Sequence, residues 1–332
     1  MALSPRDYFA SDTFEREQAA LFTRSWVPVC RAEEVGEPGA LRSALVGATP
    51  IVVARARDGH IHALSNVCRH RGMTLVEGEA RAEMIRCPYH LWTYGLDGAL
   101  LAAPFMDPAA VKGCDLPRYV VAEWGGWVFV HLSGAAPPLE AQLEPLSGAL
   151  DPARLSALRP GYRIALTHDW NWKVMVENFG ESYHHIGAHA RTLQPLWPGG
   201  ETDASPSAAD WIDIRHPTHP MAGALGVYVV FPLFLLALTP ASGGAVWYRL
   251  VPTGPESIEL EIVGLYPPQL ANDTDAMARA RAEIWAVHQE DVVVCERVQR
   301  GLRSPDAILG PLSHLEAGVA RFRDWVAAAV PG

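Results

Sequence analysis

Lysine is almost absent from this chain. Of the 27 basic residues, only Lys112 and Lys173 are lysines, and the other 25 are arginines. This excludes lysine-rich patches of the kind that address proteins to membranes or to the nucleus. The formal net charge of −10 also argues against nucleic-acid binding, because that binding depends on basic side chains that neutralise phosphates.

Cysteine is scarce as well. Five cysteines among 332 residues are too few for a disulfide scaffold. The first nine residues contain no apolar stretch of the kind found in a secretory signal. The sequence therefore predicts a protein of the reducing cytoplasm.

One run, from Met221 to Leu238, lacks any charged residue and is long enough to span a bilayer. Two features argue against a transmembrane helix. Pro232 interrupts the run, and the residues from Val227 to Phe231 are β-branched or aromatic, as in buried strands. We therefore expect a buried β-structure here and no membrane association.

Composition and turn signals together predict two domains. Hydrophobic residues make up 49% of the chain and charged residues 19%, which is typical of a folded globular protein. Short β-type runs separated by turn signals such as Gly125-Gly126 indicate a small β domain first, and helical runs at 171–185 and 276–301 fall in the second half. The predicted segments are an N-terminal helix packed on the second domain (1–26), the β domain (27–136), a linker rich in Pro, Gly and Ala (137–160) and an α+β domain (161–332).

A cluster of cysteine and histidine is the strongest chemical signal in the β domain. Cys68 and His70 lie on one expected loop, and Cys87 and His90 lie on a second. Two cysteines and two histidines can hold either a tetrahedral zinc ion or a [2Fe–2S] cluster with the thiolates on one iron and the imidazoles on the other. Zinc fingers usually pair Cys with Cys and His with His, whereas each loop here holds a mixed pair.

A second set of possible metal ligands follows Trp172. On a continuous helix, Glu177, Glu181 and His184 would share one face, and the histidines nearby make a metal site more plausible than a solvated stripe. Helical spacing alone would pair His185 with His189. His184 and His189 converge only if the helix ends or distorts, for which Gly187 offers a place.

Asp291 is a charge on an otherwise apolar stripe of the late helix. That stripe includes Ile284, Val287 and Val298. A buried carboxylate is costly unless it is paired or binds a metal, so the alternatives are an ion pair with an arginine and a metal ligand. Glu290 is the alternative ligand, but it points away from the stripe.

The two loops, at 66–72 and 87–94, resemble the cluster loops of Rieske iron–sulfur domains, and more specifically those of Rieske non-heme iron oxygenases. Leu91 stands where the family often has glycine, and we expect no effect on ligation. The resemblance implies that Cys68 and Cys87 bind one iron of a [2Fe–2S] cluster and that His70 and His90 bind the other.

The second set also resembles this family. The sequence Glu-Asn-Phe-Gly-Glu-Ser-Tyr-His, followed after four residues by a further His, is similar to the family's mononuclear-iron motif, and the helix around Asp291 is similar to the family's C-terminal helix. The resemblance implies a 2-His-1-carboxylate Fe(II) site. It implies His184, His189 and Asp291 as iron ligands and Glu181 and Asn178 as catalytic residues, with His185 beside the site.

The resemblance extends from Tyr8 to Trp325. It implies an α+β protein with an N-terminal all-β Rieske domain and a C-terminal helix-grip catalytic domain built on an antiparallel sheet. The implied activity is that of a terminal oxygenase, the alpha subunit. Such an enzyme uses O2, with electrons that reach it from NAD(P)H through a reductase or ferredoxin. It hydroxylates, dihydroxylates or oxidatively demethylates a small aromatic or amine-bearing substrate.

The family also implies a head-to-tail homotrimer in which Glu181 bridges the histidines of facing metal sites. Two alternatives come from other functional classes. One is a Rieske-type electron carrier whose second domain binds a hydrophobic ligand, and the other is a zinc-stabilised binding module.

Overall fold

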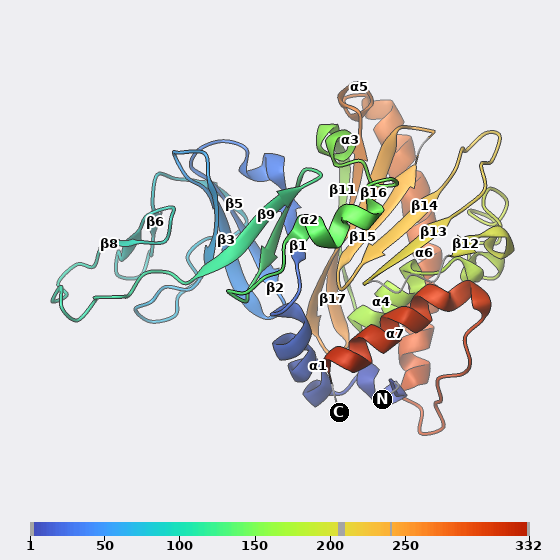
Figure 1. Ribbon diagram of the computed structural model, residues 1–332, viewed down its shortest axis with the longest axis horizontal. Coiled ribbons are helices and arrows are strands. Elements are labelled where there is room, and N and C mark those ends of the chain that lie inside the picture. Colours follow the sequence, from blue (N-terminus) through green and yellow to red (C-terminus); the bar gives the residue numbers. More distant parts are fainter. Residues whose placement is uncertain (1–2, 205–209, 240, 331–332) are drawn as a thin grey trace. The chain divides into compact units, whose positions relative to one another are not determined.

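The chain folds into two units, and the N-terminal segment belongs to the second of them. The computed structural model describes residues 3–204, 210–239 and 241–330 (Figure 1). One unit comprises residues 22–156. The other comprises residues 1–21 together with 157–332.

Unit 22–156 is built on antiparallel strands. Its large sheet has seven strands in the order β1-β10-β9-β4-β3-β2-β5, and a smaller sheet has the order β6-β7-β8. Gly125 and Gly126 join β9 to β10 with φ angles of 59° and 85°, as a two-residue hairpin turn requires. The strands are β1 (Val27–Arg31), β2 (Ala40–Val46), β3 (Thr49–Arg55), β4 (Ile61–Ser65), β5 (Glu79–Arg81), β6 (Ile85–Arg86), β7 (Thr93–Tyr94), β8 (Leu100–Ala102), β9 (Arg118–Trp124) and β10 (Trp127–His131).

The segment predicted as a linker is instead a packed part of this unit. It forms α2 (Leu139–Leu143), a 3-10 turn η4 (Glu144–Leu146) and α3 (Pro152–Ala157). The leucines of this segment are buried, at positions 139, 143, 146, 150 and 155. Leucines at helical spacing give these short helices an apolar face to bury, which the Pro, Gly and Ala content of the segment obscured.

The second unit contains a seven-stranded antiparallel sheet in the order β11-β17-β16-β15-β14-β13-β12. Long helix α6 packs against α4 and against edge strand β11, and α7 packs against β13 (Figure 1). The elements are β11 (Arg159–His168), α4 (Trp172–Phe179), β12 (Asp203–Ala204), β13 (Trp211–Arg215), β14 (Gly226–Val230), β15 (Phe234–Thr239), β16 (Gly244–Gly254), β17 (Ser257–Tyr266), α5 (Pro268–Ala271), α6 (Thr274–Leu302) and α7 (Ala317–Ala329).

The uncharged run from Met221 to Leu238 supplies most of β14 and β15, which pair with Val230 opposite Phe234. Val229 and Leu236 are fully buried in the sheet. The expected β-structure is confirmed, and among the described residues no helix has both the length and the apolar character needed to cross a membrane.

The N-terminal segment is less regular than the single helix predicted for it. It consists of a 3-10 turn η1 (Pro5–Tyr8), α1 (Ser11–Glu17) and a π-helical turn η2 (Gln18–Phe22). Glu17 is fully buried, where it forms an ion pair with Lys173 and accepts a hydrogen bond from the indole N–H of Trp172 at 2.8 Å. These two contacts with α4 hold the segment in the second unit, because a buried carboxylate requires partners.

A pair of histidines joins the end of β11 to α6. The Nε2 atoms of His168 and His288 lie 3.0 Å apart, and the His168 ring stacks on Trp170. Burial, and after it the neighbouring His288, lower the pKa of His168 to about 4. Burial also lowers the pKa of His288.

Both rings are therefore neutral at pH 7, and we expect the free energy of unfolding to fall as the pH is lowered. The unfolded chain binds more protons than the folded one between about pH 6.5 and about pH 4, so the stabilisation is present above that window and is lost on going down through it. One group contributes at most about 1.4 kcal/mol per pH unit. Urea unfolding at pH 7 and pH 5 measures this, and His168→Phe should show a smaller difference. An equal loss in both proteins would contradict the assignment.

Candidate metal centres

The two cysteine and histidine loops have the same backbone hydrogen bonds. The N–H of Cys68 donates to the carbonyl of Met73 at 2.8 Å, and the N–H of Gly72 donates back to the carbonyl of Cys68 at 3.0 Å. In the second loop the N–H of Cys87 donates to Trp92 and that of Leu91 donates to Cys87, at 2.8 and 3.0 Å. Each cysteine is therefore held at the same position of an equivalent turn.

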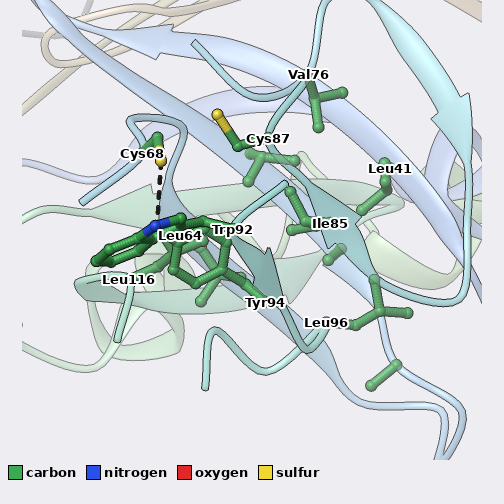
Figure 2. Close-up of a cluster of buried hydrophobic side chains, with 13 residues drawn as sticks. Leu41, Leu64, Cys68, Val76, Ile85, Cys87, Trp92, Tyr94, Leu96 and Leu116 are labelled. Atoms are coloured by element: carbon green, nitrogen blue, oxygen red, sulfur yellow. Dashed lines mark hydrogen bonds between the residues drawn. The ribbon is translucent and has the colours of Figure 1, made fainter. Parts of the chain in front are cut away.

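The two turns carry the four predicted cluster ligands, two buried cysteines and two partly exposed histidines. Cys68 and Cys87 belong to one buried apolar cluster with Trp92 (Figure 2). The rings of His70 and His90 are partly exposed and their centroids are 4.7 Å apart, yet the Nδ1 atom of each is buried and has no hydrogen-bond partner among the described residues. A buried polar atom without a partner is costly, so these donors fit a Rieske cluster bound through two thiolates and two Nδ1 atoms.

Tyr94 supports the first loop. Its hydroxyl accepts a hydrogen bond from the N–H of Arg69 at 3.0 Å and lies 3.4 Å from the sulfur of Cys68. Burial, and after it this contact with Cys68, raise the pKa of Tyr94. The protonated hydroxyl can thus donate to the sulfur, a kind of contact that tunes the reduction potential of an iron–sulfur cluster.

Leu91 adopts a backbone conformation that favours glycine. Its φ is 60°, and Gly72, at the same position of the other loop, has a φ of 75°. The Leu91 side chain is 53% exposed. The leucine therefore leaves the loop geometry intact and strains the backbone.

We expect Leu91→Gly to be more stable than Leu91→Ala by about 1 kcal/mol. A Cβ atom at positive φ costs roughly 1–2 kcal/mol, and the greater conformational entropy of glycine in the unfolded chain offsets part of the gain from removing it. Both variants remove the exposed side chain, so their comparison isolates the backbone. Thermal unfolding of the two oxidised, cluster-loaded proteins measures the difference. Equal stabilities, or a less stable glycine variant, would refute the claim of strain.

The helix that carries the second set is shorter than predicted. It ends at Phe179, and Gly180 caps it. Only glycine fits at this position, because a Cβ atom on Gly180 would lie 2.7 Å from the side chain of Ile212 on β13 and 2.9 Å from the carbonyl of Val176. The predicted common face of Glu177, Glu181 and His184 does not form. Glu177 instead pairs with Arg323 and accepts a hydrogen bond from Tyr8.

Beyond Gly180 the chain makes a 3-10 turn, η5 (Tyr183–Ile186), which brings His184 and His189 to Asp291 of α6. One possible ligand atom from each of the three lies within 4.8 Å of the others. The Nε2 atoms of His189 and His184 are 3.0 and 3.7 Å from Oδ1 of Asp291. The structure thus brings together the three predicted iron ligands.

A second carboxylate holds the outer nitrogen of each imidazole. Glu181 lies 2.6 Å from Nδ1 of His184, and Glu290 lies 2.8 Å from Nδ1 of His189. Partners of this kind set the tautomer and the orientation of a metal-binding histidine and leave Nε2 for the metal. Glu290 was predicted as an alternative ligand, and its contact with His189 was not predicted, because the two residues are 101 positions apart in the sequence.

Asn178 and the two histidines hold Asp291 in its charged form. The side-chain amide of Asn178 donates to Oδ1 of Asp291 at 2.9 Å. Before a metal binds, burial alone would raise the pKa of Asp291, but the hydrogen bond and charge of His189, the charge of His184 and the Asn178 amide outweigh burial and lower it. A charged carboxylate is the form that binds Fe(II).

His185 is not part of this set. Its Nδ1 atom lies 2.8 Å from the backbone carbonyl of Trp197 and its ring stacks on His216. Burial lowers the pKa of His185 to about 4. The pairing of His185 with His189 that uninterrupted helical spacing favoured is therefore not the one that the fold brings to Asp291.

A cavity of about 760 Å³ opens beside the candidate iron site. His184, His189 and Asp291 are among the residues that line it, as are Trp197 and Tyr248. Most of the remaining wall is apolar, contributed by α6 and by strands of the large sheet. The volume suits a small organic molecule beside the three candidate ligands.

Comparison with known proteins gives two family matches. Residues 25–120 match the Rieske [2Fe-2S] domain, and residues 155–227 and 204–332 match the catalytic domain of ring hydroxylating alpha subunits. Together the two segments of the second match cover more than half of the chain.

Among individual relatives, a glycine betaine monooxygenase oxygenase subunit of Chromohalobacter salexigens is 27% identical over 94% of this chain and 82% of its own length. A carnitine monooxygenase oxygenase subunit of Acinetobacter pittii is 34% identical over 55% of this chain, which spans about half (51%) of that relative. The fold is also shared with a solved quaternary ammonium Rieske monooxygenase, whose structure was used to study carnitine oxidation by gut microbiota and inter-subunit electron transfer. The TM-score is 0.89 at 24% identity, and the match covers 99% of this chain and 95% of that one.

Proposed function

Because the chain belongs to the family of ring hydroxylating alpha subunits with a Rieske domain, we propose that it is a terminal oxygenase acting on a small amine-bearing compound. Family membership confirms the predicted fold class, the oxygenase activity and the cofactors, a Rieske [2Fe–2S] cluster and mononuclear iron with O2. Family membership therefore argues against the two alternative functions, a Rieske-type electron carrier and a zinc-stabilised binding module. The observation that carries the proposal is the meeting of two histidines and one aspartate in the wall of a cavity.

We assign Cys68, Cys87, His70 and His90 to the cluster, on the strength of the matched loops and the partnerless Nδ1 atoms. When bound, the cluster supplies single electrons, and the mononuclear Fe(II) supplies reductive activation of O2 at its open coordination positions. An NAD(P)H-dependent reductase or ferredoxin is the proposed source of these electrons.

For the mononuclear site we assign His184, His189 and Asp291 as ligands. The chain's own part is to hold them. Glu181 and Glu290 fix the two imidazoles, and Asn178 fixes the carboxylate. The cavity places the substrate beside these ligands.

The substrate class follows from the relatives and the cavity wall. The two sequence relatives are named for glycine betaine and carnitine, both methylated amines. Trp197 and Tyr248 line the cavity, and aromatic rings attract a cationic nitrogen. In the proposed reaction one oxygen atom of O2 enters a C–H bond of an N-methyl group, and the other becomes water with two electrons and two protons. The resulting N-hydroxymethyl group then breaks its C–N bond and leaves as formaldehyde.

We further propose a head-to-tail homotrimer in which a cluster of one subunit faces the mononuclear iron of the next. Exposed apolar side chains beside both metal sites support this assembly. Tyr89 and Leu91 on the second cluster loop are each 53% exposed, and Tyr183 and Ile186 are 46% and 51% exposed around His184. Exposed apolar surface of this kind marks a contact with another protein, and a ring of identical subunits would cover both patches.

Electron transfer between subunits can be tested with two inactive variants. Cys87→Ala lacks the cluster and Asp291→Ala lacks the mononuclear iron, so mixed oligomers should regain part of the activity. Glu181→Gln in the subunit that keeps Asp291 should remove this gain if Glu181 bridges the facing histidines. A monomer by light scattering, or no recovery in verified mixed oligomers, would exclude the trimer.

The cytoplasmic location remains a prediction.

A further inference from the structure

His185 is a buried imidazole on the cavity wall that the proposed chemistry does not use. It is 4% exposed, and its ring centroid lies 5.2 Å from that of His184 and 5.6 Å from that of His189. It therefore adjoins the place where the substrate must present its reacting carbon.

The surroundings fix the orientation of this ring. It stacks on His216 at 5.2 Å with an interplanar angle of 7°, and Nε2 of His216 lies 2.9 Å from the hydroxyl of Ser182. A Cβ atom on Gly199 would lie 2.1 Å from the carbonyl oxygen of Ser182 and 3.4 Å from Cβ of His185, so only glycine allows this close approach.

The hydrogen bond to Trp197 decides which nitrogen of His185 carries the proton. The backbone carbonyl of Trp197 can only accept, so Nδ1 of His185 donates to it at 2.8 Å. In the neutral ring the lone pair is then on Nε2. This atom has no hydrogen-bond partner among the described residues, although His185 lines the cavity.

We propose that His185 is a specificity-determining residue whose Nε2 accepts a hydrogen bond from a donor on the substrate, an N–H or O–H group. This inference rests on the proposed oxygenase function and deepens it. A quaternary ammonium nitrogen carries no hydrogen and cannot use this acceptor. A protonated tertiary or secondary N-methylamine can, and so can a fully methylated compound that carries a hydroxyl. Where the N–H is the donor, this chain favours amines with an N–H over their fully methylated counterparts.

Equilibrium binding to the oxidised holoenzyme without reductant tests the proposal independently of turnover. Two matched pairs of probes distinguish the source of the donor. N,N-dimethylglycine and glycine betaine differ in one N–H, and carnitine and γ-butyrobetaine differ in one hydroxyl. Calorimetry should show that the member with the donor binds about tenfold to a hundredfold more tightly in at least one pair, as expected for a hydrogen bond to a buried acceptor.

His185→Phe keeps a ring for stacking but has no acceptor, and the preference should fall to within about twofold. His185→Gln restores an acceptor and should restore the preference. Iron content and cluster absorbance of each variant show that it is folded and loaded. The proposal would be overturned if the two members of each pair bound the unmodified enzyme with equal affinity, or if no probe bound measurably. It would also be overturned if the preference for the member with the donor survived in His185→Phe. Failure of the oxygenase proposal would appear separately, as absence of oxygenated product.

Discussion

Asp291→Ala is expected to lower turnover to below about 1% of the unmodified enzyme, because loss of a supporting residue alone costs roughly 10- to 100-fold in metal affinity or activity and loss of a ligand costs more. The brown colour and the EPR signal of the reduced cluster should remain, since Asp291 belongs to the other metal set. Iron analysis should give about two atoms per chain in place of three.

Glu290→Gln is the matched control, one residue away on the same helix. Glu290 contacts His189 only through Nδ1 and also accepts a hydrogen bond from Thr192, so its loss should weaken iron binding by roughly 10- to 100-fold and leave the ligand set complete. Excess Fe(II) should therefore restore Glu290→Gln and fail to restore Asp291→Ala. Normal coupled turnover in Asp291→Ala would show that another residue is the third ligand.

Cys87→Ala is expected to have the opposite spectroscopic result. The absorbance and EPR signal of the cluster should disappear, and turnover should be lost because no electrons reach the mononuclear site. The unit of residues 22–156 should also lose stability, by several kcal/mol (on the order of the 2–5 kcal/mol typical of losing a structural cross-link), because metal binding contributes folding energy.

Cys114→Ala serves as the control, because Cys114 lies outside both loops and packs only at the edge of the same apolar cluster. It should keep the cluster absorbance and change the melting temperature by a few degrees at most. A Cys87→Ala protein that stays brown would remove Cys87 from the ligand set.

The sequence by itself determined what depends on short segments. Each cysteine and histidine loop closes through hydrogen bonds across four or five residues, so its spacing is visible in the chain. The same is true of the Gly125-Gly126 turn. The predicted stripe was right about the burial of Asp291 but not about its neighbours, because Val298 is 44% exposed and the buried face of the helix carries His288 and Gln299. Gly180 was a local signal too, since glycine often ends a helix, but it was overlooked.

Only the tertiary structure decided how these pieces meet. The need for glycine at the end of α4 comes from Ile212 of β13, which leaves no room for a Cβ atom on Gly180. The partners of the histidines are equally distant in sequence, since Glu290 reaches His189 from α6 and the Trp197 carbonyl takes the Nδ1 proton of His185. Three adjacent or nearby histidines have the same intrinsic chemistry, so their division into two candidate ligands and one free acceptor comes from the carboxylates and carbonyl that the fold places against each ring.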